Sequence, residues 1–405
     1  MPSGQSRTTG HAESNETGRR PLNILFLCEG DAETRDSWSG VSQSIVKGLR
    51  AEGHTVIPGD VDLYGMERIG VAARTPALSR RRWWVKYHLG RHGWEARSAH
   101  SRRWVAEQKD KVDLILQVGA TFHAPKIEGL PLLLFCDSNI QMAREGIGTG
   151  YSEAAVLREH EIEKIHARES LVYADADYIF TMSHYLSDSF AEHFGVPREQ
   201  MSTLHCGPNV DVDNLVFSPD DKAADPTILF VGRDFHRKGG DILLAAFEKL
   251  RARVPNAKLV MIGNTPKSTP PEGVTMLGFQ SRDTASGASA MDMSFRSAHI
   301  FCLPTRYDAF GTSFVEAMGY ALPCVGPNAW AVPESIADGE TGLLVPPEDP
   351  AALAEALARL IEDPERAAEM GRAGRERALA QFSWTDMIDT MLDAMYGLVG
   401  AQSRS

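Results

Sequence analysis

The stretch Phe230-Val-Gly-Arg-Asp-Phe-His-Arg-Lys-Gly-Gly240 decides the expected fold. The apolar run over 227–232 that ends in it is typical of a strand buried on both faces of a parallel sheet. A basic loop follows, and a helical pattern then covers 239–253. Because ligands of open α/β sheets bind beyond the carboxyl ends of the strands, Arg233 and Lys238 are expected at a ligand site. Two cations before a helix N-terminus suit a diphosphate, although a solvated basic loop is the alternative interpretation.

A second stretch, 304–318, also follows an apolar strand, here over 299–303. A helix is expected over 311–320, and the free N–H groups of its first turn would point at a phosphate or sugar oxygen. An ionised carboxylate only accepts hydrogen bonds, so the one at Glu316 suits ribose hydroxyls. Taken singly, Asp308 is better explained as a helix-capping or turn carboxylate and Glu316 as an exposed helix residue. Together with the neighbouring first stretch, they favour function. The candidate site residues are Asp308, Phe310, Gly311, Thr312, Ser313 and Glu316.

The strand–loop–helix pattern occurs twice along the chain. The first half begins with a strand over 22–28, a helix over 41–52 and a strand over 54–58, and a long amphipathic helix is expected over 151–174. Other strands are expected in the first half at 112–117, 131–136, 177–181 and 201–205, and in the second at 227–232, 258–263, 274–277, 299–303 and 322–325. Successive parallel α/β units predict an α/β protein of two facing Rossmann-like domains.

The same pattern sets the expected domain boundaries. Residues 1–20 are polar and predict a disordered tail, and residues 21–207 form the first Rossmann-like domain. A polar stretch with several prolines begins near 207 and marks the linker into the second domain, 208–382. A last helix is expected over 383–398.

Composition excludes several classes of function. The 405 residues carry a net charge of −12, which argues against a dedicated nucleic-acid binder with a basic face. The five cysteines are scattered and form no CxxC pair, so we expect reduced thiols and a cytoplasmic protein. No apolar run approaches the roughly 20 residues that span a bilayer.

Residues 79–104 form an unusual basic and aromatic segment. It holds four of the seven tryptophans and eight Lys or Arg against one acid, Glu95. Such a segment suits peripheral contact with the inner face of a membrane or with an anionic lipid-linked acceptor. The alternative, slightly favoured, is a helical hairpin whose tryptophans pack into the first domain.

The two stretches resemble the retaining glycosyltransferases of family 4, which have the GT-B fold. The family pattern is a strand followed by G-R-x4-K-G, and later P-S-x-x-E-x-F-G-x4-E-A-M. Asp308 stands where the family usually has Glu, so the carboxylate is kept but reaches one methylene less far. Segments 53–56, 176–183 and 338–345 extend the resemblance over most of the ordered chain. The matching residues are Gly232, Arg233, Lys238, Gly239, Pro304, Phe310, Gly311, Glu316, Ala317 and Met318.

The resemblance implies transfer of a hexose, with retention of anomeric configuration, from a nucleotide-diphosphate sugar to a glycan, lipid-linked or small-molecule acceptor. The first domain would bind the acceptor, the second would bind the nucleotide sugar, and the last helix would cross back to the first domain. Arg233, Lys238 and the backbone at Gly40 would hold the diphosphate, together with the Thr312 and Ser313 amides of the helix N-terminus.

The remaining implied roles concern the sugar and the ribose. Asp308 would contact the transferred sugar beside Phe310 and Gly311, and Glu316 would hold the ribose. A catalytic His is common on the first domain of the family. The matching stretch 134–139 has none, so Asp137 is the candidate for that place, while His123 lies on the wrong side of a loop and strand.

No metal ion or cofactor is expected beyond the nucleotide sugar as co-substrate. No Asp-x-Asp metal pair of the kind used by the other main glycosyltransferase fold is assigned to the site. Fixed cations and helix N-terminal amides could stabilise the departing diphosphate instead.

Three other functions compete with transfer. One is a sugar-nucleotide epimerase or phosphorylase on the same fold, and another is a non-catalytic sugar-nucleotide binding module. A nicotinamide dehydrogenase is disfavoured because the early glycine loop is not GxGxxG.

Overall fold

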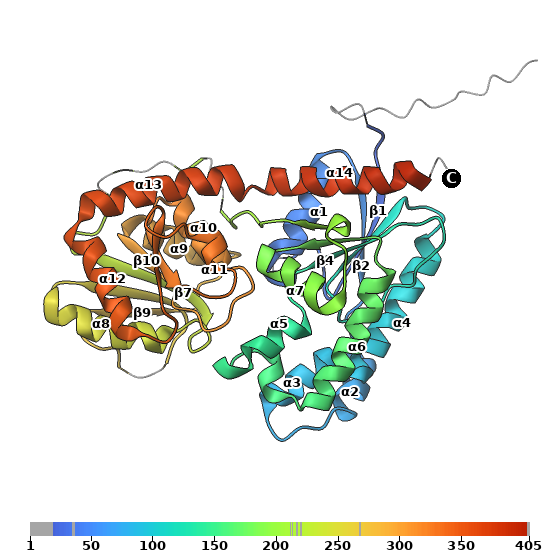
Figure 1. Ribbon diagram of the computed structural model, residues 1–405, viewed down its shortest axis with the longest axis horizontal. Coiled ribbons are helices and arrows are strands. Elements are labelled where there is room, and N and C mark those ends of the chain that lie inside the picture. Colours follow the sequence, from blue (N-terminus) through green and yellow to red (C-terminus); the bar gives the residue numbers. More distant parts are fainter. Residues whose placement is uncertain are drawn as a thin grey trace, which may run out of the picture.

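The computed structural model describes residues 19–402 except 35–36, 211, 213, 216–217, 219–220 and 267–268, and describes only the backbone at 37, 39 and 402. The chain forms two α/β halves that lie side by side and share one long helical run along a common edge (Figure 1). This arrangement confirms the two facing Rossmann-like domains. Most of the expected tail over 1–20 lies outside the described residues.

The first half is built on a six-stranded sheet in the order β2-β1-β3-β4-β5-β6, and every neighbouring pair is parallel. All residues of β3 and β4 are buried, as expected for continuous apolar runs covered on both faces. The strands are β1 (Asn23–Cys28), β2 (Thr55–Asp60), β3 (Leu114–Val118), β4 (Leu132–Cys136), β5 (Tyr178–Thr181) and β6 (Met201–Thr203).

The helices of the first half include one correction. The helix expected over 151–174 begins only at residue 159, because a separate 3-10 turn, η3 (Glu153–Val156), precedes it. The backbone N–H of Arg158 donates to the Glu161 carboxylate at 2.9 Å and marks the true helix start. The helices are α1 (Val41–Ala51), α2 (Gly65–Ala73), α3 (Arg80–Leu89), α4 (Arg91–Gln108), α5 (Ile140–Glu145), α6 (Glu159–Asp175) and α7 (His184–Phe194), with shorter 3-10 turns η1 (Ser37–Gly40), η2 (Gly146–Thr149) and η4 (Arg198–Gln200).

The basic and aromatic segment 79–104 forms the consecutive helices α3 and α4. Trp83 stacks on Tyr87 with ring centroids 5.5 Å apart, and the indole N–H of Trp104 donates to the Asp60 carbonyl at 2.9 Å. Trp94 packs against a buried apolar cluster of the first half. Only Trp84 is strongly exposed among these four, so this surface presents a single tryptophan rather than a belt.

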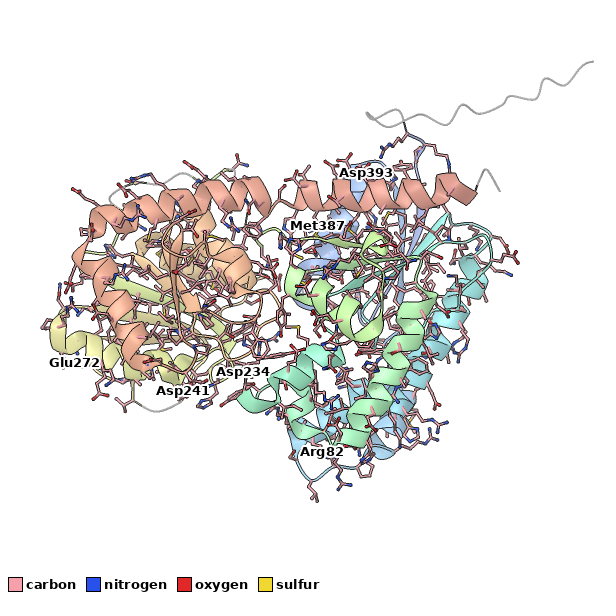
Figure 2. All side chains as sticks on the ribbon, in the orientation of Figure 1. Arg82, Asp234, Asp241, Glu272, Met387 and Asp393 are labelled. Atoms are coloured by element: carbon pink, nitrogen blue, oxygen red, sulfur yellow. The ribbon has the colours of Figure 1, made fainter. Side chains whose placement is uncertain are left out.

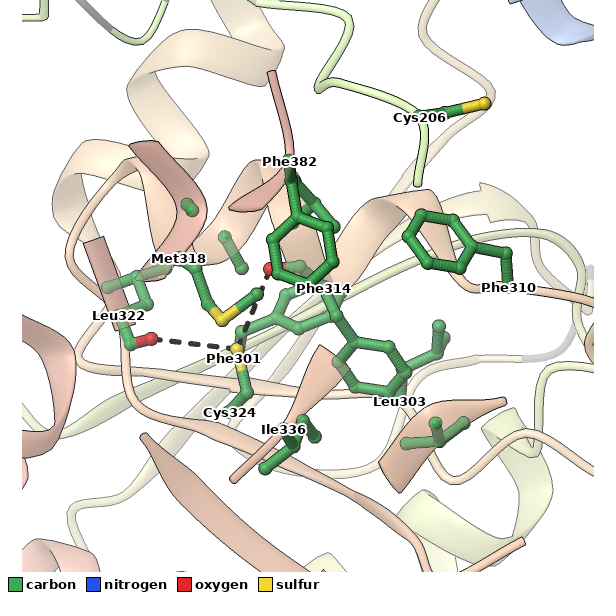
Figure 3. Close-up of a cluster of buried hydrophobic side chains, with 14 of the residues drawn as sticks. Cys206, Phe301, Leu303, Phe310, Phe314, Met318, Leu322, Cys324, Ile336 and Phe382 are labelled. Carbon is green, nitrogen blue, oxygen red and sulfur yellow. Dashed lines mark hydrogen bonds between the residues drawn. The ribbon is translucent and has the colours of Figure 1, made fainter. Parts of the chain in front are cut away.

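The second half repeats the architecture with the strand order β12-β11-β10-β7-β8-β9, again all parallel. Phe301, Phe314 and Met318 pack in its core (Figure 3). Its strands are β7 (Thr227–Asp234), β8 (Lys258–Asn264), β9 (Val274–Gly278), β10 (Ile300–Cys302), β11 (Cys324–Pro327) and β12 (Gly342–Val345). Its helices are α8 (Gly240–Arg253), α9 (Ala285–Ser297), α10 (Thr312–Gly319), α11 (Val332–Ser335), α12 (Pro350–Glu362) and α13 (Pro364–Gln381).

The last helix, α14 (Trp384–Gln402), leaves the second half and lies against α1 of the first. This confirms the expected crossing back. Met387 and Ile388 are buried beneath the helix, whereas Asp393 is exposed and pairs with Arg19 at 2.7 Å (Figure 2). Within the described part of the chain, no helix is both long and apolar enough to cross a membrane. All five cysteines are buried.

The contact between α14 and α1 is close enough to test. Gly48→Ala is expected to destabilise the protein by about 1–3 kcal/mol through overpacking, because the new Cβ would lie 2.5 Å from Cγ1 of Ile388. Gly397→Ala on the exposed side of α14 is the matched control, since nothing lies within 4 Å of its new Cβ. The control should gain about 1 kcal/mol from helix propensity. Equal thermal stability of the two variants would contradict this docking.

Candidate active site

A cleft of about 1240 Å³ lies between the two halves. It is lined by loops that follow β1, β4, β7, β9 and β10, so the carboxyl ends of both sheets open into it. Asp234, at the end of β7, lies where the second half faces the first (Figure 2). Every site residue predicted from the sequence lines this cleft except Gly40.

The second half contributes a cationic wall. Arg233 is exposed near the end of β7, and its guanidinium lies over the Phe279 ring, 5.4 Å from the centroid. Arg237 also lines the cleft and donates to the Tyr307 carbonyl at 2.9 Å. Arg233 makes no ion pair with any described residue, so its charge is available to an anionic ligand.

A buried ion pair joins the two motifs of this wall. The Lys238 ammonium donates to the Asp308 carboxylate, and the two side chains are only 12% and 10% exposed. Burial lowers the pKa of Lys238, and Asp308 opposes that effect. Burial would raise the pKa of Asp308, but Lys238 and Arg237 hold it below its ordinary value. The contact with Asp308 uses one N–H of Lys238, so its remaining N–H groups can be offered to a phosphate.

Two glycines begin the helices that point at the cleft. Gly239 caps α8 with φ 74°, and Gly311 caps α10 with φ 77°, a left-handed conformation that favours glycine. A Cβ on Gly239 would lie 1.9 Å from the Pro304 carbonyl oxygen, so only glycine lets the two motifs approach. Neither cap supplies a side-chain acceptor, which leaves the first-turn N–H groups of Thr312 and Ser313 for a ligand.

Glu316 lies on the inner face of α10 at the bottom of the same wall. Its carboxylate Oε2 accepts a hydrogen bond from Arg282 at 2.9 Å, and its side chain is 7% exposed. This bond fixes the orientation of the carboxylate and leaves Oε1 to accept from a ligand hydroxyl.

The first half contributes an acidic wall. Asp137 follows β4, where burial and the nearby Glu153 carboxylate raise its pKa to about 7. Glu29 follows β1 and pairs at 2.9 Å with Arg97, whose side chain is fully buried. Burial alone would raise the pKa of Glu29, but the hydrogen bond with His88 and the charge of Arg97 hold it below its ordinary value.

One histidine lies on this acidic wall, and the sequence patterns did not point to it. His88, on α3, lines the cleft with Nδ1 3.3 Å from a Glu29 oxygen, and its ring lies 4.4 Å from that of Trp84. The helix carries no recognised motif, so only the folded chain brings His88 to the site. His123 does not line the cleft and instead lies 2.9 Å from Asp175.

Two predicted residues contribute differently from what we expected. Gly40 is buried and does not line the cleft, whereas its neighbours Trp38 and Val41 do. The Phe310 side chain is 2% exposed and its ring packs near Phe382 (Figure 3). What Phe310 offers the site is its backbone N–H, which donates to the Asp308 carboxylate.

Within the described ranges, one group of side chains has the spacing to hold a metal ion. His184, His205 and Glu334 place their ligand atoms within 4.8 Å of one another, but none of them lines the cleft. The Glu334 carboxylate already accepts from the backbone N–H groups of His184 and Tyr185 at 2.7 and 2.8 Å. It therefore ties the second half to the N-terminus of α7 in the first.

The raised pKa of Asp137 generates a pH-dependent prediction. Its folded pKa is about 7, against an unfolded value of about 3.9. The ionised side chain thus costs folding free energy that is absent at low pH and fully present above the folded pKa. Asp137→Asn should raise the melting temperature at about pH 8 and much less at about pH 4. Exposed Asp110→Asn is the control, and a stability gain independent of pH would contradict the assignment.

Comparisons with known proteins agree with this geometry. The family described as "Glycosyl transferases group 1" matches residues 211–377. A GDP-mannose-dependent alpha-(1-6)-phosphatidylinositol monomannoside mannosyltransferase of Mycolicibacterium smegmatis is 31% identical over 230 residues, which cover 52% of this chain and 59% of the relative. An alpha-maltose-1-phosphate synthase of the same species is 28% identical over 279 residues, covering 62% of this chain and 67% of the relative. The chain thus spans less than two thirds of the length of the first relative.

Solved structures share the fold of the whole described chain. Sucrose-phosphate synthase from Thermosynechococcus elongatus superimposes with a TM-score of 0.72 at 20% identity, covering 94% of this chain and all of that one. The Anabaena protein HepE, solved with UDP and glucose, gives 0.61 at 14% identity over 93% of this chain and all of its own. The chain therefore has the GT-B fold, and its residues 211–377 match the model of the glycosyl transferases group 1 family.

Proposed function

We propose that this protein is a retaining glycosyltransferase of family 4, which moves a hexose from a nucleotide-diphosphate sugar to a glycan, lipid-linked or small-molecule acceptor. One observation carries the proposal. A single cleft sets two cations and a helix N-terminus of the second half opposite a carboxylate of the first. The family match over 211–377 and the transferase names of the relatives support the reaction class.

The donor diphosphate would lie between Arg233, Lys238 and the amides of Thr312 and Ser313. Arg233 can make a forked contact, and Lys238 a point contact beside its partner Asp308. The helix N-terminus adds N–H donors and its dipole at the same place. These charges are already in position, so they stabilise the leaving diphosphate without reorganisation as the sugar bond breaks.

The transferred sugar would lie just before the N-terminus of α10, and the ribose would lie beside the middle of that helix. Asp308, with the backbone of Phe310 and Gly311, would bind hydroxyls of the transferred sugar. The free Oε1 of Glu316 would accept from ribose hydroxyls, because Arg282 holds the other oxygen. Asp137 lines the same cleft from the first half, and we propose it as the group of that half nearest the oxocarbenium-like sugar. The acceptor would approach along the acidic wall.

The proposal also includes a cellular setting. A cytoplasmic location, inferred from reduced cysteines, stays a prediction. A peripheral membrane contact through 79–104 also stays a prediction, and the packing of Trp83, Trp94 and Trp104 within the first half reduces its support.

Hydrolysis of a panel of UDP-, GDP- and ADP-sugars tests the reaction, with GDP-mannose included because a relative is named for it. We expect slow hydrolysis of one nucleotide class without an acceptor. Lys238→Ala should lower the rate by about 10²- to 10³-fold, because it removes a fixed charge from the leaving group.

The matched control for this test is Lys249→Ala, which removes an exposed lysine from the outer part of α8. It should hydrolyse the donor at the unaltered rate. Near-normal turnover in Lys238→Ala would exclude the assigned role. Tight nucleotide binding without turnover of any donor would favour a binding module instead.

Turnover should also continue in excess EDTA. Arg233 and Lys238 supply the positive charge that a divalent ion supplies in metal-dependent transferases. The measurement is donor hydrolysis before and after exhaustive chelation. A complete loss that Mg²⁺ or Mn²⁺ restores would contradict metal independence.

A further inference from the structure

Two carboxylates of the acidic wall have no cationic partner in the described chain. Asp137 and Glu153 both line the cleft, and Asp137 accepts only from backbone N–H groups, its own and that of Ser138. The buried Arg97 of this wall is already shared between Glu29 at 2.9 Å and Asp62 at 3.7 Å. Two nearby carboxylates without a cation repel one another, and burial strengthens that repulsion.

A buried hydroxyl without a hydrogen-bond partner lies at the same place. Tyr307 is 5% exposed and lines the cleft, and its hydroxyl finds no partner among the described residues. A buried polar atom left without a bond typically costs about 1–3 kcal/mol, so such atoms in native sites point to a missing ligand or water. The charges of Glu153 and Asp137 act on this hydroxyl, and the charge of Arg237 acts on it in the opposite sense.

Packing contacts place the Tyr307 ring beside the segments that carry the two carboxylates. The Tyr307 ring belongs to an apolar cluster with Cys136, the residue that directly precedes Asp137. A Cβ added to Gly146 would contact both the Tyr307 ring at 2.9 Å and Cβ of Ser152, the residue before Glu153, at 3.0 Å. The two halves of the protein therefore build this subsite jointly, and Tyr307 is adjacent in sequence to the sugar-binding candidate Asp308.

The charge of the surrounding wall is consistent with the same kind of ligand. Its described residues present the carboxylates of Glu29, Asp31, Asp62, Asp137 and Glu153. Trp84 and Tyr64 line the same wall and offer apolar faces on which a sugar ring can stack. The carboxylates of this wall would repel a phosphate. An ammonium group would neutralise the Asp137 and Glu153 carboxylates and donate a hydrogen bond to the Tyr307 hydroxyl.

We propose that Asp137, Glu153 and Tyr307 bind a protonated amino group of the acceptor, so that the acceptor is an amino sugar or aminocyclitol rather than a phosphorylated sugar or lipid. The inference rests on the proposed function, because it names the acceptor class of the same cleft. The ammonium would lie beside Asp308. This position would keep a neighbouring hydroxyl of the acceptor near the donor sugar.

The test compares acceptors that differ in one group. Methyl α-glucoside, its 2-amino, 3-amino and 6-amino derivatives and its 6-phosphate are titrated into the full chain loaded with the nucleotide product, and transfer from the donor is followed in parallel. At neutral pH and low salt, at least one amine should bind about tenfold or more tightly than the neutral glucoside, which corresponds to about 1.4 kcal/mol. The phosphate should bind worst, and added salt should reduce the preference.

Variants separate the subsite from its surroundings. Glu153→Gln and Tyr307→Phe should reduce the preference for the amine toward unity, while Tyr307→Phe keeps full thermal stability because its hydroxyl has no bond to lose. Glu163→Gln, an exposed acid on α6, is the control and should keep the preference.

Each outcome has a definite meaning. Equal or weaker binding of every amine relative to the neutral glucoside, including no binding by any of the five, overturns the proposal. Preferred binding of the phosphate does so as well. If donor hydrolysis persists in those cases, the proposed function stands and only the acceptor class is wrong. If no donor is bound or hydrolysed, the proposed function itself fails.

Discussion

The buried pair of Lys238 and Asp308 is the interaction on which the site depends. It joins the loop after β7 to the loop after β10, and these two strands are neighbours in the second sheet. Removing one partner of such a pair leaves the other charge buried and typically costs about 3–5 kcal/mol. The same contact joins the residues just before α8 to those just before α10, whose first residues line the cleft. The ion pair that would position the diphosphate site therefore also holds together the carboxyl ends of the central strands β7 and β10.

The fold was largely predictable because its strands are continuous apolar runs ended by glycine or charge. Continuous apolar runs of this length, such as 227–232 and 131–136, are typical of parallel strands that are buried on both faces. The helix expected over 151–174 shows the limit of periodicity. Its first eight residues lie outside α6, and four of them, Glu153–Val156, form a separate 3-10 turn.

The candidate site likewise contains some residues that the sequence could predict and others that it could not. Arg233, Lys238, Asp308 and Glu316 lie in two motifs that directly follow strands, so their convergence could be predicted from sheet topology. His88, Glu153 and Tyr307 reach the cleft from segments whose position depends on the whole fold, and no local spacing identifies them. Gly40 lies close in sequence to cleft residues but below the surface, a difference of one residue that sequence patterns do not resolve.

The chain passes between the two halves twice, and the two passages lie together. The indole N–H of Trp384, at the start of α14, donates to the Pro208 carbonyl of the linker at 2.9 Å. Gly207 leaves no room for a side chain there, since a Cβ would lie 2.5 Å from the Trp384 ring. Two connections anchored at one point act as a single pivot, which permits rotation and resists sliding. Relative motion of the two halves would therefore be a hinge rotation. The displacement would be smallest near Trp384 and largest at the side of the cleft farthest from it.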